Sequence, residues 1–504
     1  MKRKKVSRLL AASLATAMTV SMVGCGNSDA PASSTTSDDS SSADQETPAA
    51  DTADTSEGEA SSEAEGETEE AADDGYEVLT DADGNVYDLG GMEIIIRDWW
   101  SPADGSVAEP KDDFEEAQQE YREWAQETYN FTLKQMAISD WASTPQDFVE
   151  YATAGGDENY AWVLREDPAT SSAMASGLMY DLSTLDCLDF SDSKFSNKVH
   201  EKFGKGTAIY CMSSGKPEPR TGIFFNKRIL TDAGIDPEEI YDLQASGDWT
   251  WDKFEEYLSI VQRDIDNDGV IDIAGFNENN GVVQMAVFSN NGAFIGKDSS
   301  GMFTYALEDP NTLEALEWAA KIINDYRQVP PEDAQWDYYK QAFVNGEIAF
   351  MPEDAYCMYY NSEDNKGFLC DMEDDFGFVM FPKGPQASDY VNVWSDNPVA
   401  IPSCYDADKA WKIAFAWNVW TENPPGYEDY VNYAHVYAGA RDTRAVDETF
   451  AMMTEKGVIS YQGVIPSLDF GPDFIWGFGK GVVVSEAVEG IRDTWKSYVD
   501  AANQ

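Results

Sequence analysis

Apolar positions recur along the chain with two spacings, which predict strands and helices in alternation. Continuous apolar runs at residues 92–97, 131–138 and 161–164 predict three buried strands. The segment after the first run has helical spacing, with one apolar face: Phe114, Ala117, Tyr121 and Trp124. Strands that alternate with helices predict an α/β fold with parallel sheets, in which ligands meet the loops at the carboxyl ends of the strands.

Residues 220–276 carry the most specific pattern. An apolar run at 222–225 precedes a short helix that ends at Gly234, and Asp236 before Pro237 has the chemistry of a helix N-cap. Thr250 caps the next predicted helix, whose apolar face consists of Trp251, Phe254, Leu258 and Val261. An acidic loop follows this helix directly.

Four pieces of this stretch, in order, resemble the extracellular solute-binding proteins of carbohydrate ABC importers, of the maltose-binding-protein type: FFNK, AGID, GDWTWDKFEEY and DNDGVIDIAGF. The resemblance continues through GLMYDLS, QAFVNGEIAFM, FGFVMFPKGP and NPVAIPS. It implies a type II periplasmic-binding-protein fold, with two α/β lobes that are discontinuous in sequence and a ligand cleft between them.

The length agrees with two lobes, since 504 residues with 42% apolar content can bury two domain-sized cores. The resemblance assigns residues 76–215 and 384–438 to the first lobe. It assigns residues 216–383 and 439–504 to the second.

The N-terminus predicts export and lipid attachment. Residues 1–24 have the basic start and short apolar run of a signal peptide. Val23, Gly24 and Cys25 resemble a bacterial lipobox, which implies a palmitate-bearing lipid on Cys25 and anchorage at the extracellular face of the cytoplasmic membrane. An uncleaved anchor with an incidental cysteine is the alternative. Residues 25–75 have 16 acidic and no basic residues, a composition typical of a disordered tether.

The formal net charge of −59 limits the partners. Nucleic acids and anionic membrane surfaces require clustered Lys and Arg, so neither is expected as a direct partner. The same charge favours a neutral ligand over a polyanionic one.

Beyond Cys25 the chain has an odd number of cysteines: Cys187, Cys211, Cys357, Cys370 and Cys404. None has CxxC spacing or a neighbouring His. We therefore expect mostly free thiols rather than a disulfide framework or a zinc site, with one bridge left open.

The candidate ligand-binding residues are aromatic and charged side chains at strand ends. Aromatic rings stack on the C–H faces of sugars, and polar side chains bind sugar hydroxyls. The ends of the first three strands supply Asp98, Trp99, Trp100, Asp140, Trp141, Arg165, Glu166 and Asp167. The resemblance adds Tyr356, Trp394, Asp396, Asn397 and Trp476. A core position is the alternative for each aromatic residue, and a surface ion pair is the alternative for residues 165–167.

The acidic loop has the spacing of a calcium site. Alternate residues match positions 1, 3, 5, 7 and 9 of an EF-hand loop: Asp264, Asp266, Asp268, Val270 through its carbonyl, and Asp272. Position 12 is Gly275, so the usual bidentate Glu is missing. A structural Ca²⁺ and a solvated acidic turn both stay open, and no organic cofactor is expected.

Together these features predict a monomeric, lipid-anchored receptor that captures a neutral oligosaccharide and delivers it to ABC permease subunits, without enzymatic chemistry. One alternative is a secreted glycosidase, which needs only two suitably spaced carboxylates. The chain has 93 acidic residues and only two His, so it supplies such a pair in any fold and little material for His-based catalysis. A surface glycan sensor or adhesion lipoprotein, using the same cleft without transport, is a further alternative.

Overall fold

The computed structural model describes residues 75–215, 220–279, 281–363, 365–394, 397–428 and 430–504. Cys25, the signal peptide and the tether up to residue 74 lie outside the described residues, as does Asp396. Every element below belongs to one unit, Ala72–Gln504. None of the described helices combines the length and the apolar character that a bilayer span requires.

The first lobe is built on a four-stranded sheet with the order β15-β3-β1-β2. β1 (Met92–Asp98) pairs in parallel with β2 (Phe131–Ala137) and with β3 (Tyr160–Val163). These are the three strands that the apolar runs predict. β15 (Val399–Ala400) runs antiparallel to β3, so the sheet is mixed and the prediction of a parallel sheet is wrong at this edge.

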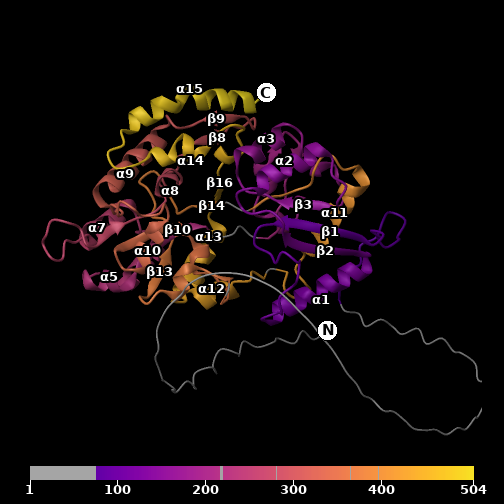
Figure 1. Cartoon of the computed structure of the whole chain (residues 1–504), viewed down its shortest axis with the longest axis horizontal. Helices are drawn as coiled ribbons and strands as arrows, with labels where there is room; N and C mark the ends of the chain where they lie inside the picture. Colours follow the sequence, from indigo (N-terminus) through magenta and orange to yellow (C-terminus); the bar gives the residue numbers. More distant parts are fainter. Residues whose placement is uncertain (1–74, 216–219, 280, 364, 395–396, 429) are drawn as a thin grey trace, which may run out of the picture. The chain divides into compact units, whose positions relative to one another are not determined.

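The helices of the first lobe come from both ends of the chain. They are α1 (Asp113–Thr128), α2 (Thr144–Ala154), α3 (Pro168–Ala175), α4 (Val199–Lys202) and α11 (Ala407–Trp420). α1 begins after Asp112, whose side chain accepts the N–H of Glu115. Figure 1 shows α11, in orange, among the indigo and purple elements of this lobe, and α11 packs against α1. The first lobe is therefore discontinuous in sequence.

The second lobe surrounds a sheet with the order β13-β6-β10-β7. β10 (Ile348–Asp354) runs antiparallel to β6 (Thr221–Asn226) and parallel to β7 (Ala274–Phe276), and β13 (Phe376–Val379) runs antiparallel to β6. Its helices are α5 (Lys227–Asp232), α6 (Pro237–Ser246), α7 (Trp251–Val261), α8 (Gly281–Ser289), α9 (Pro310–Tyr326), α10 (Tyr338–Val344), α12 (Ala434–Gly439), α13 (Ala451–Glu455), α14 (Phe470–Asp473) and α15 (Val484–Ala502).

Two-stranded ribbons and single turns complete the described chain. The ribbons are β4 (Gly204–Lys205) with β5 (Ala208–Ile209), β8 (Ile295–Lys297) with β9 (Phe303–Tyr305), β11 (Tyr360–Ser362) with β12 (Asn365–Lys366), and β14 (Asn392–Trp394) with β16 (Gly457–Ile459). The turns are the short 3-10 segments Leu182–Thr184, Ser193–Phe195, Ala355–Met358, Phe368–Asp371, Gln462–Val464 and Ile475–Gly477. A π-helix, Ala445–Phe450, precedes α13.

The pattern at residues 220–276 forms the elements that it predicts. Asp236 caps α6, and α6 ends at Gly247, whose φ of 81° is the left-handed conformation that glycine adopts without strain. Thr250 caps α7 by accepting the N–H of Lys253. The predicted apolar face of α7 is buried in the core of the second lobe.

The resemblance assigns segment 384–438 to the first lobe, but in the structure both ends of this segment pack in the second lobe. Tyr390 and Val393 at one end, and Val436 in α12 at the other, pack in the second-lobe core. The stretch from β15 to α11 between these ends joins the first-lobe core, through residues such as Val399, Tyr405 and Ile413. The five described cysteines are free thiols: Cys187, Cys211, Cys357, Cys370 and Cys404.

Candidate functional site: the cleft between the lobes

A cavity of about 760 Å³ is lined by side chains from both lobes. The first-lobe wall comes from strand ends: Trp99 after β1, Trp141 after β2, and Arg165 and Glu166 after β3, with Asn397 before β15. The second-lobe wall includes Arg220, Thr221, Trp336, Tyr339, Lys340, Glu353, Asp354 and Tyr356. The volume lies within the range of about 300–1,000 Å³ that small-molecule sites occupy.

In the first-lobe wall, Arg165 holds Trp141. The Arg165 guanidinium lies 4.1 Å from the centroid of the Trp141 ring, and its Nε donates to the Trp141 carbonyl oxygen at 2.9 Å. Arg165 also pairs with Asp167, at 2.7 Å. The ring is thus fixed by a cation–π contact while 57% of Trp141 stays exposed. A ring that is both fixed and exposed suits a stacking ligand.

Glu166 connects this wall to the segment that follows β16. Its carboxylate pairs with Lys202, whose Nζ also donates to the Ser460 hydroxyl at 3.3 Å. A Cβ at Gly463 would lie 1.9 Å from Glu166 Oε2, so a larger residue at position 463 would displace the carboxylate. Glu166 therefore lines the cavity and also contacts the chain that continues into the second lobe.

In the second-lobe wall, the acidic side chains accept hydrogen bonds from neighbouring hydroxyls. Thr221, at the start of β6, donates to Asp354 at 2.6 Å, and these two residues are cross-strand partners. The Tyr339 hydroxyl donates to Glu353. Burial raises the pKa of Glu353 above its ordinary value. The carboxylates are therefore held in fixed positions at the end of β10.

Comparison with solved structures identifies the arrangement. UgpB from Mycobacterium tuberculosis, in complex with glycerophosphocholine, aligns over 82% of this chain and 99% of its own, with a TM-score of 0.55 and 16% identity. The GacH receptor of Streptomyces glaucescens, studied unliganded and with acarbose, aligns over 81% and 99%, with a TM-score of 0.53 and 12% identity. The cyclic α-maltosyl-1,6-maltose binding protein of Arthrobacter globiformis aligns over 82% and 98%, with a TM-score of 0.53 and 12% identity.

The chain has the two-lobed solute-binding-protein fold. This confirms the fold class that the resemblance implies. No protein-family model matches the sequence, and the comparison with curated proteins gives no match either. The likeness is therefore one of structure, spread over four fifths of the chain.

In this solute-binding-protein fold, some of the predicted ligand-binding residues meet in the cavity. They are Trp99, Trp141, Arg165, Glu166, Tyr356 and Asn397. Asp98 is fully buried, and its carboxylate accepts the N–H of Ser101 at 3.0 Å and the Ser101 hydroxyl at 2.6 Å. It shapes the turn after β1 and does not line the cavity.

Other predicted residues have different contacts. Trp100 packs edge-on against Trp99, with ring centroids 5.0 Å apart, outside the cavity lining. Asp140 accepts the N–H of Ser143 before α2, and Asp167 caps α3. The Trp394 ring lies on Gly457 of the neighbouring strand, where a Cβ would be 1.4 Å from its Nε1. Short polar side chains and aromatic rings at strand ends also serve as caps and packing, which sequence spacing does not separate from binding.

Two smaller hollows adjoin the cavity and share lining residues with it. One, of about 380 Å³, shares Asn279, Trp336 and Tyr339 and contains Trp476. The other, of about 250 Å³, shares Arg165, Glu166 and Gln284. Trp476 therefore lies beside the cavity rather than in it. The cavity and the two hollows that share its lining residues are together called the groove.

Several lining residues were not predicted: Arg220, Thr221, Asn279, Gly281, Gln284, Trp336, Tyr339, Lys340, Pro352, Glu353 and Asp354. Among these residues, Trp336 could most readily have been predicted from the sequence. It stands between two helical patterns in a polar stretch and is 73% exposed. A large aromatic side chain that no apolar face requires is a candidate for ligand contact.

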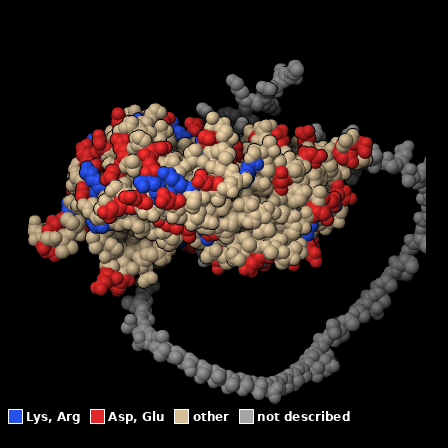
Figure 2. Space-filling model, turned by 90° about the horizontal axis from the view of Figure 1, so that it is seen from above, with Lys and Arg blue, Asp and Glu red and all other residues tan. Residues whose placement is uncertain are grey.

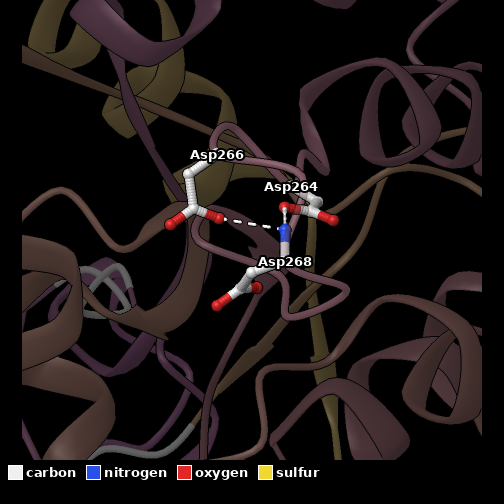
Figure 3. Close-up of side chains that lie close together, drawn as sticks. All are labelled: Asp264, Asp266 and Asp268. Carbon is white, nitrogen blue, oxygen red and sulfur yellow. Dashed lines mark hydrogen bonds between the residues drawn. The ribbon is translucent and has the colours of Figure 1, made fainter.

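None of the residues of the acidic loop between α7 and β7 lines the cavity. Figure 3 shows three aspartates of this loop close together. Asp264, Asp266 and Asp268 each offer a carboxylate oxygen within 4.8 Å of the others. The carboxylates of Asp264 and Asp266 both accept the N–H of Asp268, at 3.2 and 3.1 Å. Asp272 instead accepts the N–H of Ile265 at 2.5 Å. Three of the predicted ligands thus come together, and the fourth carboxylate bonds to the base of the loop.

Proposed function

We propose that this protein is the substrate-binding component of an ABC importer for a carbohydrate, and that it binds its ligand without converting it. The observation that carries the proposal is a cavity lined by both lobes in which exposed tryptophans stand beside charged and amide side chains. Indole rings stack on sugar C–H faces, while carboxylates, amides and guanidinium groups bind sugar hydroxyls. Solved proteins with this fold include receptors for acarbose and for a cyclic maltosyl-maltose, which supports a carbohydrate ligand.

Capture requires only that the closed arrangement of the two lobes binds the ligand more tightly than the open one. The two walls supply different halves of the contact set, with Trp141 on one and Trp336 on the other. A permease then distinguishes the loaded protein by its closed form. No covalent step is needed.

A glycan array probed with residues 76–504 tests this proposal. Saturable binding to one class of glycan is expected. Binding to no glycan, together with binding to a peptide library, would contradict it.

We further propose that Cys25 carries a lipid and that residues 25–75 tether the domain to the extracellular face of the cytoplasmic membrane. The support is the sequence alone, because this segment lies outside the described residues. A Cys25→Ser protein should leave the membrane fraction and enter the medium. Its retention at the membrane would contradict lipid anchorage.

We propose a structural Ca²⁺ in the acidic loop. The donor set suits this ion, because Ca²⁺ binds carboxylate and carbonyl oxygens. Asp264, Asp266 and Asp268 converge, and Asn267 and Gly269 take left-handed backbone angles (φ 61° and 91°) that curl the loop around them. Bound Ca²⁺ would offset the repulsion among these carboxylates.

A further inference from the structure

We propose that the captured carbohydrate carries an anionic group, a carboxylate or a sulfate, and that Lys340 binds it. This inference rests on the proposed function and names the substrate class. The chain has 93 acidic and 34 basic residues, and on the face shown in Figure 2 acidic side chains are more widespread than basic ones. Among the residues that line the cavity, by contrast, the basic set (Arg165, Arg220, Lys340) equals the acidic set (Glu166, Glu353, Asp354) in number.

Each of these three carboxylates already has a donor within the protein. Glu166 pairs with Lys202, Glu353 accepts the Tyr339 hydroxyl, and Asp354 accepts the Thr221 hydroxyl. A carboxylate that accepts such bonds in the empty cavity is partly satisfied. The acidic lining is therefore neutralised or hydrogen-bonded before any ligand arrives.

Lys340 differs from these groups. Its ammonium donates to the neutral hydroxyl of Tyr356 at 3.2 Å, and it forms no ion pair with any carboxylate of the described residues. Burial raises the pKa of Glu353 and the nearby Lys340 charge opposes this rise, but the Glu353 carboxylate bonds to Tyr339 rather than to Lys340. An ammonium has three N–H donors. Lys340 thus retains donors and a charge for a ligand.

Aromatic rings hold this ammonium at the cavity wall. The Lys340 Nζ lies 5.8 Å from the ring centroid of Trp336, 5.7 Å from those of Tyr339 and Tyr356, and 5.5 Å from that of Phe368. These cation–π contacts limit where the flexible side chain can go. A sugar ring stacked on the exposed face of Trp336 would therefore present a substituent to a cation whose position is already set.

The adjoining hollow of about 380 Å³ also has a lysine beside exposed tryptophans. Lys480 lines it together with Trp336 and Trp476, and its Nζ donates to the backbone carbonyl of Asn324 at 3.2 Å. Among the described residues Lys480 forms no ion pair either. Two cations free of ion pairs thus stand along one groove beside exposed indole rings. Such a groove attracts an anion despite the negative charge of the whole protein.

The test compares an acidic glycan with its neutral derivative. An array that holds uronic-acid, sialylated and sulfated glycans beside neutral ones selects the tightest acidic binder. Calorimetry then measures this glycan and its methyl ester or desulfated form against the wild type, Lys340→Gln and Lys205→Gln. Lys205 is an exposed lysine outside the cavity lining, so Lys205→Gln controls for the change in net charge.

We expect the neutral derivative to bind the wild type at least about tenfold more weakly, because a charged hydrogen bond is lost. Lys340→Gln should remove this difference, so that the acidic glycan and its neutral derivative bind the variant with similar affinity, while Lys205→Gln keeps the difference. Tight binding of neutral glycans only, or equal binding of the acidic glycan and its derivative, would overturn this inference and leave carbohydrate capture standing. Binding to no glycan of either class would overturn the proposed function itself.

Discussion

At the scale of single residues, two tryptophans in similar sequence positions have different contacts: one lines the cavity and the other does not. Trp141 and Trp100 both follow first-lobe strands, and both are about half exposed, at 57% and 51%. Only Trp141 lines the cavity, where Arg165 fixes its ring. Trp100 packs against Trp99 instead. The pair offers a matched test of which ring a ligand uses.

Trp141→Ala should weaken ligand binding by about tenfold or more, because a stacked ring contributes on the order of 1 kcal/mol beyond its buried area. Trp100→Ala should change the dissociation constant by less than about twofold. Calorimetry with the best ligand from a glycan array measures both. Neither ring is core, so thermal melting should be similar in the two variants. Equal losses of affinity would show that the cavity lining is wrongly assigned.

Glu278 is a buried acid beside the groove whose protonation links stability to pH. Its side chain is fully buried and lies 3.6 Å from Arg327, and burial raises its pKa to about 7 from an ordinary value of 4.5, while Arg327 opposes the shift. The folded state therefore holds this proton more tightly than the unfolded state does. The free energy of unfolding contributed by Glu278 falls as the pH rises from about 4.5 to about 7 and is constant above that range.

Glu278→Gln removes this titration. Between about pH 5 and pH 8, the stability of the variant relative to the wild type should therefore rise, by at most about 3 kcal/mol. Denaturant unfolding of both proteins at several pH values measures the change. If the free energies of unfolding of the two proteins differ by the same amount at every pH, Glu278 is ionised throughout the range.

At the scale of elements, prediction from sequence succeeds where the determinants are local. The caps of α6 and α7 and the buried runs of β1, β2 and β3 depend on residues close together in the chain, so their positions were predictable. The ribbon of β14 and β16 has short strands that pair across a long connection. Apolar runs of this length carry no periodic signal. The lack of a periodic signal in such short strands also explains why the sequence did not show that the ends of segment 384–438 pack in the second lobe.

The acidic loop between α7 and β7 gives a prediction at this scale. If Ca²⁺ stabilises the folded loop, removing the ion with EGTA should lower the melting temperature by about 2 °C or more. Asp266→Ala should melt at the same temperature with and without EGTA. Asp298→Ala is the matched control, because Asp298 likewise accepts backbone N–H groups in an exposed turn, yet has no part in the cluster. An EGTA effect that persists in Asp266→Ala would contradict calcium binding at this loop.

At the scale of the whole molecule, the sequence predicted the architecture better than the site. A pattern spread over many residues identified the two-lobed fold, since every matching piece adds to it. The cavity depends instead on which few side chains of each lobe reach the cleft. The loop before α10, with Trp336, follows no strand end, and Lys340 lies on α10 itself, so the strand-end rule missed both. Net charge is a poor guide to the cavity for a similar reason: it averages over the whole chain, whereas the cavity lining has equal numbers of basic and acidic residues.

The central claim is that the two walls together bind one glycan and release it unchanged. Calorimetry of the best array ligand against the wild type, Trp141→Ala and Trp336→Ala, followed by mass spectrometry of the recovered ligand, tests it most directly. We predict one glycan per protein, a loss of affinity of about tenfold or more in each variant, and recovered ligand of unaltered mass. Recovered fragments would indicate a hydrolase, and full affinity in both variants would place the ligand outside this cleft.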